Sequence, residues 1–226
     1  MIRLSEKIVA DVKQRIFTGT YKKGQRLPAE LELAKEHEVS RSVIRESLRN
    51  LESLGLVTIK KGPKGGIFIS ESYHKPISDS LQGLVDAGQV TEENIFDIRL
   101  LLETYATAQA ALNADDKEIA RLRSLLDPPR EKLNNAQWLQ ANRSRFHLGL
   151  ARAAKNPVLE VLMNGLIRLL RKYFKDFHDL EFERRSLVTH GKILTAVENR
   201  DPETARTLME AYILDMRDFI QAGQTD

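Results

Sequence analysis

A glycine-rich hairpin directly after three short amphipathic segments is the feature that most constrains how this chain can fold. Residues 57–59 and 67–69 are rich in β-branched and aromatic side chains and are typical of half-buried strands. The run Gly-Pro-Lys-Gly-Gly at 62–66 joins them and supplies the residues that tight turns need. Since no other segment shows this strand pattern, we predict a single small hairpin in an otherwise helical protein.

Three helices are predicted before the hairpin. Residues 4–18 carry Ile and Val at four-residue spacing, which places them on one helix face. Pro28 is predicted to open a second helix, because proline is tolerated in a first turn. Ser40 is a good N-cap for a third helix that runs to about Ser53. Three helices followed by a two-stranded hairpin are typical of a winged helix-turn-helix.

The rest of the chain predicts an all-α antiparallel helical bundle. About six helices joined by short loops cover roughly 135 residues, which is long enough for a separate hydrophobic core. The predicted helices span about 91–112, 115–126, 135–155, 157–179, 181–199 and 202–221. The expected fold class is therefore mainly α. Its expected domains are a winged helix-turn-helix at 1–72, a linker at 73–90 with room for a short helix, and the bundle at 91–226.

Composition narrows the class of protein. The chain has no cysteine, which excludes disulfides and thiolate metal sites. Neither a signal-peptide pattern nor an apolar run of membrane-spanning length is found, so we expect a cytoplasmic protein without membrane contact. Residues 1–75 carry 15 Lys and Arg against 9 Asp and Glu, whereas the remainder carries 20 against 23. A basic module joined to a mildly acidic one indicates that the first meets a polyanion.

The third predicted helix has the residues that read DNA. Arg41, Arg45 and Arg49 follow one another at four-residue spacing, so three guanidinium groups lie on one face, with Ser42 near the helix start. Arginine forks match guanine O6 and N7 in the major groove, and they also match phosphate oxygens. In the hairpin, lysines flank glycines whose bare backbone can approach a phosphate; they are Lys60, Lys61 and Lys64. The alternative is a solvated helix face on which these arginines form only ion pairs, such as Arg49 with Glu46.

The segment GQRLPAELELAKEHEVSRSVIRESLRNLESLGLVTIKKGPKGGIFI resembles the N-terminal domain of the GntR family of transcription regulators. The LPAE opening, the VSR..IRE.L helix, the LGL helix end and the glycine-rich wing occur in order. The resemblance implies base contacts from Arg41 and Arg45. It implies backbone or base contacts from Ser42, Arg49, Lys61 and Gly62. One departure is Leu31, where some relatives have an operator-reading arginine.

The C-terminal half resembles the FadR subfamily and its ligand-binding FCD domain. The matching pieces are FDIRLLLE (96–103), FHLGLARAAKNPVL (146–159), HGKILTAVENRDPETAR (190–206) and LMEAYI (208–213). In that family a carboxylate and three histidines often bind a divalent metal below a small carboxylate effector. Here His147 and His190 hold two of the four positions, but Arg143 replaces the carboxylate and Tyr212 replaces the last histidine.

These exchanges predict a pocket without a metal or other cofactor, because two imidazoles without a carboxylate make a poor site. We expect Arg99, together with Arg143, to face the carboxylate of an effector directly. His147, His190 and Tyr212 are expected to complete the pocket through hydrogen bonds. A divalent metal at His147 and His190 is the disfavoured alternative. A further alternative is that the two histidines are hydrogen-bonded core residues and that Arg143 points into solvent.

The expected function is a non-enzymatic, sequence-specific transcription regulator, most simply a repressor. Its partners are expected to be double-stranded operator DNA, a small organic acid and a second copy of the chain, because two half-sites about one helical turn apart call for a dimer. Two alternatives belong to other classes. A DNA-tethered, metal-dependent hydrolase needs a complete catalytic site, and a non-specific nucleoid protein predicts equal affinity for every duplex.

Overall fold

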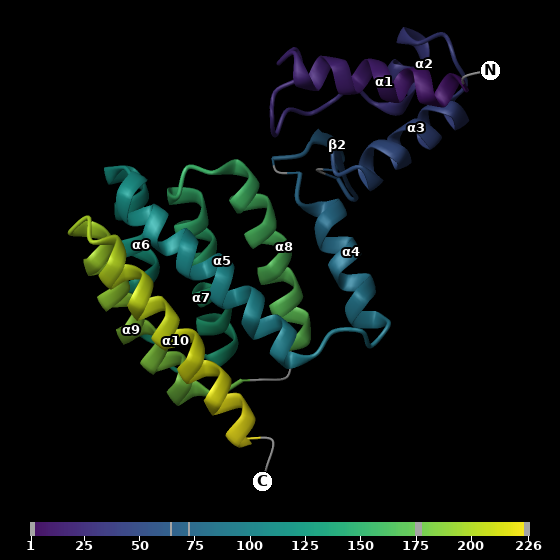
Figure 1. The fold of residues 1–226 in the computed structure, drawn as a ribbon. Coiled ribbons are helices and arrows are strands. Elements are labelled where there is room, and N and C mark those ends of the chain that lie inside the picture. The colour runs from purple at the N-terminus through teal and green to yellow at the C-terminus, as the bar shows by residue number, and fades with distance from the viewer. Residues whose placement is uncertain (1–2, 64, 72, 175–177, 224–226) are drawn as a thin grey trace. The chain divides into compact units, whose positions relative to one another are not determined.

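The computed structural model describes residues 3–63, 65–71, 73–174 and 178–223 (Figure 1). The chain divides into two compact units between Asp79 and Ser80. One unit holds three helices and a two-stranded sheet, and the other is helical throughout the part described. The expected fold class, mainly α with one small hairpin, is confirmed.

The first unit is a winged helix-turn-helix. Its helices α1 and α2 both pack on α3, and the hairpin strands pair antiparallel with Val57 opposite Ile69 and Lys60 opposite Gly66. The buried faces of α1 and α3 form one core with the hairpin. Each fully buried aliphatic side chain of this kind contributes about 1.5–3 kcal/mol. The elements are α1 (Leu4–Phe17), α2 (Glu30–Glu36), α3 (Arg41–Ser53), β1 (Val57–Lys60) and β2 (Gly66–Ile69).

Two helix starts in this unit differ in detail from the expectation. Pro28 does not open α2, because Ala29 is the N-cap and the helix begins at Glu30. The Glu32 carboxylate accepts a hydrogen bond from the Ala29 backbone N–H at 2.8 Å, and this contact fixes the later start. Ser40 is the N-cap residue of α3 as predicted, but its hydroxyl lies 2.7 Å from Ser42 Oγ and caps no backbone N–H.

The second unit is the predicted helical bundle. Helix α10 packs along α5 and α9, as Figure 1 shows, and α7 packs on α5, α6, α8 and α9. Ala106, Ala110 and Ala111 of α5 are fully buried in the core of the bundle, where small side chains allow neighbouring helices to pack closely. The elements are α5 (Glu92–Asn113), α6 (Asp116–Leu126), the short 3₁₀ helix η1 (Arg130–Lys132), α7 (Ala136–Ala153), α8 (Pro157–Tyr173), α9 (Leu180–Glu198) and α10 (Pro202–Gly223).

Side-chain caps fix where the bundle helices begin. Thr91, Asp115 and Asp201 cap α5, α6 and α10, each accepting a backbone N–H within 3.1 Å. The expected end of α8 at about 179 is wrong, since the helix ends at Tyr173. Asp179 instead caps α9 by accepting from the Phe182 backbone N–H at 2.7 Å, so it cannot continue the preceding helix.

The predicted linker is largely helical. Residues 75–86 form α4 (Lys75–Asp86), which is longer than the short helix expected there. Leu81 and Val85 of this helix pack against the core of the second unit. The sequence underestimated the length of this helix because Pro76 and Gly83 lie within it. Pro76 is tolerated since it occupies the first turn.

Candidate functional site

Helix α3 presents one polar face and buries the other. Ile44, Leu48 and Leu51 are buried in the core of the first unit. On the opposite side Arg41, Ser42, Arg45 and Arg49 are all exposed. The structure therefore places the four predicted DNA-contacting residues of this helix on one solvent-facing surface. A rigid core behind the helix holds them there.

A carboxylate that the sequence analysis did not single out lies beside two of these arginines. Glu30 Oε2 is 2.8 Å from Arg45 Nε and 3.5 Å from Arg41 Nη2. The hydrogen bond and the charge of Arg45, with smaller contributions from Arg41, hold the pKa of Glu30 below its usual range, although burial opposes this. The alternative of ion pairs along α3 itself is not seen among the described residues, because the partner comes from α2.

The wing supplies the second part of this surface. Lys61 and Gly62 are exposed, and Gly62 has φ +99°, a backbone conformation that favours glycine. Arg26 Nη2 donates to the Gly65 carbonyl at 2.9 Å and so ties the turn to the segment before α2. Arg26 was missed because a single arginine in a loop gives no sequence signal. Lys64, also expected in the wing, lies outside the described residues.

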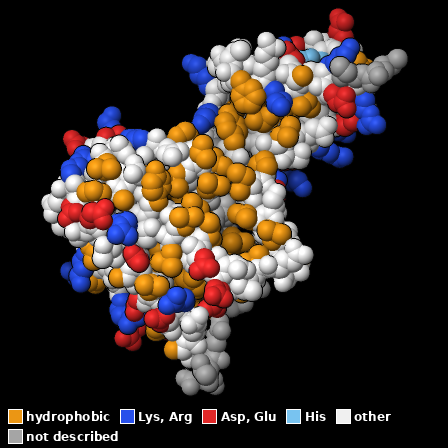
Figure 2. All heavy atoms as spheres, in the orientation of Figure 1, with side chains coloured by type: hydrophobic (Ala, Val, Ile, Leu, Met, Phe, Trp, Pro, Cys, Tyr) orange, Lys and Arg blue, Asp and Glu red, His pale blue; other side chains and the backbone are white. Residues whose placement is uncertain are grey.

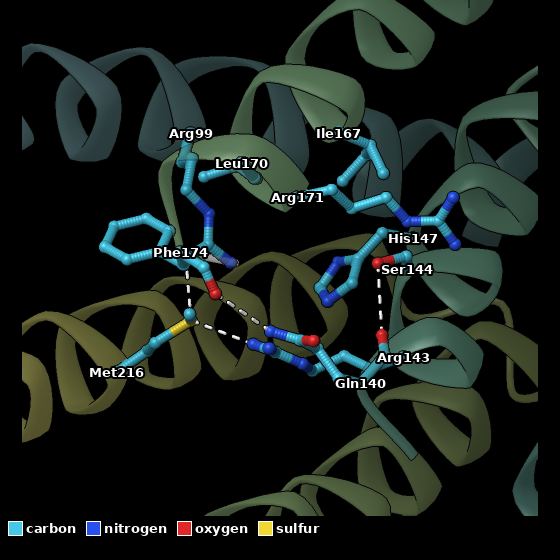
Figure 3. Close-up of a pocket in the computed structure, with 10 residues that line it drawn as sticks. All are labelled: Arg99, Gln140, Arg143, Ser144, His147, Ile167, Leu170, Arg171, Phe174 and Met216. Carbon is cyan, nitrogen blue, oxygen red and sulfur yellow. Dashed lines mark hydrogen bonds between the residues drawn. The ribbon is translucent and has the colours of Figure 1, made fainter. Parts of the chain in front are cut away.

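A second polar site lies inside the bundle. A partly open cavity of about 30 Å³ is lined by side chains of α5, α7, α8 and α10 and by Phe174, and Figure 3 shows the side chains around it. That volume holds about two water molecules. The cavity is lined by Arg99, Gln140, Arg143, Ser144, His147, Ile167, Leu170, Arg171, Phe174 and Met216.

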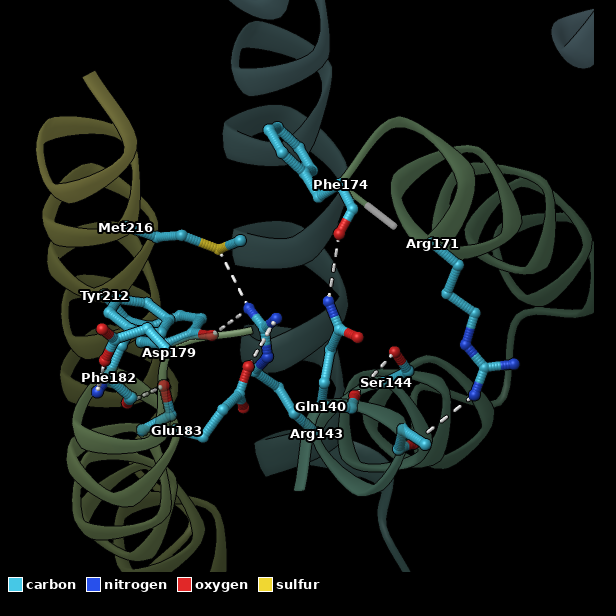
Figure 4. A network of polar contacts seen from close by, with 12 residues as sticks. Gln140, Arg143, Ser144, Arg171, Phe174, Asp179, Phe182, Glu183, Tyr212 and Met216 are labelled. Carbon is cyan, nitrogen blue, oxygen red and sulfur yellow. Dashed lines mark hydrogen bonds and ion pairs between the residues drawn. The ribbon is translucent and has the colours of Figure 1, made fainter. Parts of the chain in front are cut away.

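The five predicted effector residues are all buried and close together. Arg99, Arg143 and His147 line the cavity, whereas His190 and Tyr212 lie behind His147, with ring centroids 4.9 Å and 5.6 Å from its own. The Arg143 guanidinium donates to Tyr212 Oη at 3.2 Å (Figure 4). The structure thus brings the five residues together, but only three of them line the cavity, a distinction that the sequence did not give.

Two buried carboxylates were missed. Glu103 contacts Arg99 Nε at 2.6 Å and His147 Nδ1 at 2.7 Å, and Glu183 Oε1 lies 3.0 Å from Arg143 Nη2 (Figure 4). The expectation of imidazoles without a nearby carboxylate is therefore wrong. Glu103 follows Arg99 by four residues, which is a detectable helical pair. Glu183 comes from α9, and no local pattern points to it.

Burial and paired charges compete in this cluster. Burial alone would raise the pKa of Glu103, but Arg99 and His147 outweigh it and hold that pKa well below its usual range. Burial raises the pKa of Glu183, and Arg143 opposes the shift only in part. The pKa of His147 is lowered by burial despite Glu103, and the pKa of His190 is lowered further by burial and the neighbouring cations. Both imidazoles are therefore neutral near pH 7.

The donor set does not suit the divalent metal that the family resemblance implies. No group of three or more His, Asp or Glu able to hold a metal ion occurs among the residues that the structure describes. The His147 Nδ1 contact is taken by Glu103, whose other oxygen is bound by Arg99. Arg143 also brings a fixed positive charge to the place where a carboxylate ligand would be needed.

Comparisons with known proteins agree with both units. The family profile "Bacterial regulatory proteins, gntR family" matches residues 4–69, and the profile "FCD domain" matches residues 94–215. The Uxu operon regulator of Haemophilus influenzae is 32% identical over 219 residues, which cover 89% of this chain and 76% of that protein. The Exu regulon transcriptional regulator of Escherichia coli K12 is 28% identical over 220 residues, covering 93% and 82%.

A solved structure supports the same fold. Streptococcus agalactiae GntR superposes with a TM-score of 0.67 at 24% identity, covering 95% of this chain and 99% of that one. None of the helices in the described residues combines the length and the apolar content of a membrane span. The chain belongs to the GntR family, with an FCD domain in its C-terminal half, and is a DNA-binding transcription regulator rather than an enzyme.

Proposed function

We propose that the chain is a repressor that binds its operator as a homodimer and is controlled by a small carboxylate bound in the FCD domain. The relative NanR of Cronobacter sakazakii, named a transcriptional repressor, is 28% identical over 220 residues and supports the sign of regulation. The observation that carries the effector proposal is the charge of the cavity wall. Three arginines line the cavity, and no carboxylate does.

At the DNA, Arg41 and Arg45 are the base-reading residues of this proposal. Their exposed guanidinium groups project from a helix whose other face is fixed in a core. Ser42 and Arg49 lie beside them and would contact phosphates or base edges. Lys61 and Gly62 in the wing would contact the backbone or the minor groove. Base contacts of the arginine type discriminate by about 1–3 kcal/mol each, whereas phosphate contacts mainly position the protein.

In the bundle, the two carboxylates lie behind the arginines and not in the cavity wall. Glu103 neutralises Arg99, and Glu183 neutralises Arg143, but the Arg143 Nε has no hydrogen-bond partner among the described residues. A buried donor without an acceptor is costly, so a carboxylate that supplies the acceptor stabilises the site. We propose that Arg99 and Arg143 take the effector carboxylate in place of a metal ion.

His147 adds a hydroxyl-binding position to this pocket. Its Nδ1 lies 2.7 Å from Glu103 Oε2, although the two atoms do not have hydrogen-bond geometry, so we assign the proton of the neutral imidazole to Nδ1. This leaves Nε2 as an acceptor without a partner in the described structure. A hydroxyl beside the carboxylate would donate to it. His190 and Tyr212 hold this imidazole and Arg143 in place from behind. The chemistry of this set of groups suits a small hydroxylated acid, and the cavity would have to widen to admit one, because its volume of about 30 Å³ holds about two water molecules.

The dimer contact of the proposal is the outer face of α5 and α8. Figure 2 shows hydrophobic side chains gathered over these two helices. Leu101 of α5 is 65% exposed, and Ile98, Tyr105 and Leu112 lie on the same helix face. Val158 and Leu162 of α8 are also exposed. An exposed apolar stripe on the outer face of a helix is typical of an interaction surface, and a second copy of the chain would cover this one isologously.

The same helix would couple the effector to the dimer. Arg99 and Glu103 lie on the buried face of α5, and the apolar stripe runs along its outer face. A shift of α5 when the effector binds would change how two copies meet and so the spacing of their recognition helices. Those helices must lie about 34–36 Å apart to read adjacent major grooves. The effector can shift the balance between the two dimer arrangements only by the difference between its affinities for them.

A thermal-shift screen with small carboxylates tests the effector proposal. A true effector raises the melting temperature with its concentration, by the equivalent of about 2.7 kcal/mol at 100 times its Kd. Arg171→Ala, at the exposed edge of the cavity, should weaken the response about tenfold without disturbing the core. Arg121→Ala removes an equally exposed arginine on α6 and should leave the response unchanged. No shift with any acid, or one bound divalent ion per chain in purified protein, would refute the proposal.

A further inference from the structure

Glu30 has a position in the DNA-binding unit that packing does not explain. It is the first residue of α2, and its side chain is one-third exposed, so it fills no part of the core. Its Oε2 atom nevertheless meets two arginines of α3, Arg45 Nε at 2.8 Å and Arg41 Nη2 at 3.5 Å. One oxygen thus joins the two residues that the proposed function uses to read bases.

The way Arg45 is held leaves its outer edge available. The hydrogen bond to Glu30 uses Nε, the nitrogen nearest the stem, and neither terminal NH₂ group of Arg45 forms a hydrogen bond with Glu30. A guanidinium can offer those terminal groups as a fork to guanine O6 and N7. Because the inner edge is tied down, less rotamer freedom is lost when the fork meets its base.

Arg49 lies on the same face of α3 but does not contact Glu30, so it serves as a comparison for Arg41 and Arg45. It lies one turn beyond Arg45 and has no ion-pair partner in the described part of the chain. Its charge is therefore fully available to any phosphate. The charges of Arg41 and Arg45, by contrast, are partly compensated by the carboxylate between them. The carboxylate therefore weakens the purely electrostatic attraction of Arg41 and Arg45 to phosphates. Directional hydrogen bonds from these two arginines to base edges are favoured by comparison.

We propose that Glu30 is a specificity-determining residue of the DNA interface. It orients Arg45 and Arg41 toward base edges, and its charge lowers their affinity for phosphates in general. Non-specific affinity is almost entirely electrostatic, so one carboxylate at this surface reduces it more than it reduces affinity for a matched site. This inference rests on the base-reading roles proposed for Arg41 and Arg45.

Two variants separate orientation from charge. Glu30→Gln keeps an oxygen acceptor beside Arg45 but removes the charge, and Glu30→Ala removes both. The full-length chain is used with a duplex chosen by in vitro selection and with a scrambled duplex of the same composition. We expect both variants to bind the scrambled duplex about threefold to tenfold more tightly, with a steeper salt dependence. The ratio of selected to scrambled affinity should fall about tenfold in Glu30→Ala and less in Glu30→Gln.

Glu93→Gln is the matched control, because it removes one exposed carboxylate from the first turn of α5 and changes the net charge equally. It should leave the ratio unchanged. Ratios within twofold of the parent chain in both Glu30 variants would overturn the proposal, as would an equal effect of Glu93→Gln. A changed preference at one base pair without tighter scrambled binding would show that Glu30 reads that base itself. If Arg45→Ala binds the selected duplex as tightly as the parent chain does, Arg45 does not read bases. That result would refute the proposed DNA interface itself, separately from the role of Glu30.

Discussion

Arg143 Nη2 lies 3.0 Å from Glu183 Oε1 in the interior of the bundle, where the glutamate side chain is 1% exposed. The same guanidinium donates to Tyr212 Oη and to the sulfur of Met216. One side chain from α7 therefore links α9 and α10 and also forms part of the cavity wall. Stability of the bundle and binding in the proposed pocket depend on the same charge.

Removing only one partner of this pair should destabilise the bundle. Arg143→Ala leaves Glu183 buried without its cation, and we expect a loss of about 3–5 kcal/mol. Arg143→Met combined with Glu183→Gln removes both charges and should recover most of that loss. Trp138, the single tryptophan of the chain and a residue of α7, reports urea unfolding of the bundle by its fluorescence. Equal stability of Arg143→Ala and the parent chain would contradict this assignment.

The buried imidazoles predict how stability changes with pH. Burial lowers the pKa of both His147 and His190, so below their ordinary pKa the unfolded chain binds more protons than the folded one. Stability then rises with pH. Below about pH 6.5 it falls by at most about 1.4 kcal/mol per pH unit for each histidine, until the pH reaches the folded-state pKa of that histidine. The raised pKa of Glu183 acts in the opposite direction, because its extra stability is lost as pH rises.

The contribution of Glu183 cancels when the parent chain is compared with a variant that lacks only one histidine. His190→Gln should show a slope between pH 5 and 6.5 that is smaller than the parent slope by about one proton. Unfolding in urea, followed through Trp138 at several pH values, measures the difference. Identical slopes in the two proteins would mean that His190 does not stay neutral in the folded bundle.

Much of the architecture could be predicted because it follows from local rules. The stripe of Ile44, Leu48 and Leu51 and the caps at Thr91 and Asp115 are encoded within a few residues. The partners of the functional side chains are not local. Glu30 meets Arg45 across two helices, and Glu183 meets Arg143 from a different part of the bundle, so neither pair leaves a sequence pattern. The sequence analysis singled out Arg45 and Arg143 but not Glu30 and Glu183, the carboxylates that form ion pairs with them.

If the apolar outer face of α5 is the dimer contact, one charged residue introduced into it should disrupt the dimer. Leu101→Asp places a carboxylate in the centre of the proposed contact, and we expect the chain to sediment as a monomer at micromolar concentration. Operator affinity should fall with it, because two half-sites are then read independently. Val188→Asp, on an α9 residue that is 64% exposed, is the control and should leave the sedimentation coefficient unchanged. An unaltered dimer in Leu101→Asp would place the interface elsewhere.

We expect the wing to contribute to DNA affinity without contributing to sequence preference. Lys61→Ala should weaken binding to a selected and a scrambled duplex by the same factor and reduce the slope of log affinity against log salt by about one. Lys117→Ala, an exposed lysine of α6, should leave both quantities as they are. Loss of affinity for the selected duplex alone would show that Lys61 reads bases.

The affinity ratio between a selected and a scrambled duplex tests most directly whether this chain reads sequence through α3. At about 0.15 M salt we expect the full-length chain to prefer the selected duplex by about a thousandfold or more. Arg45→Ala should lower that preference by about tenfold to a hundredfold while leaving scrambled binding nearly unchanged. Equal affinity for both duplexes, or a preference that survives Arg45→Ala intact, would contradict the account.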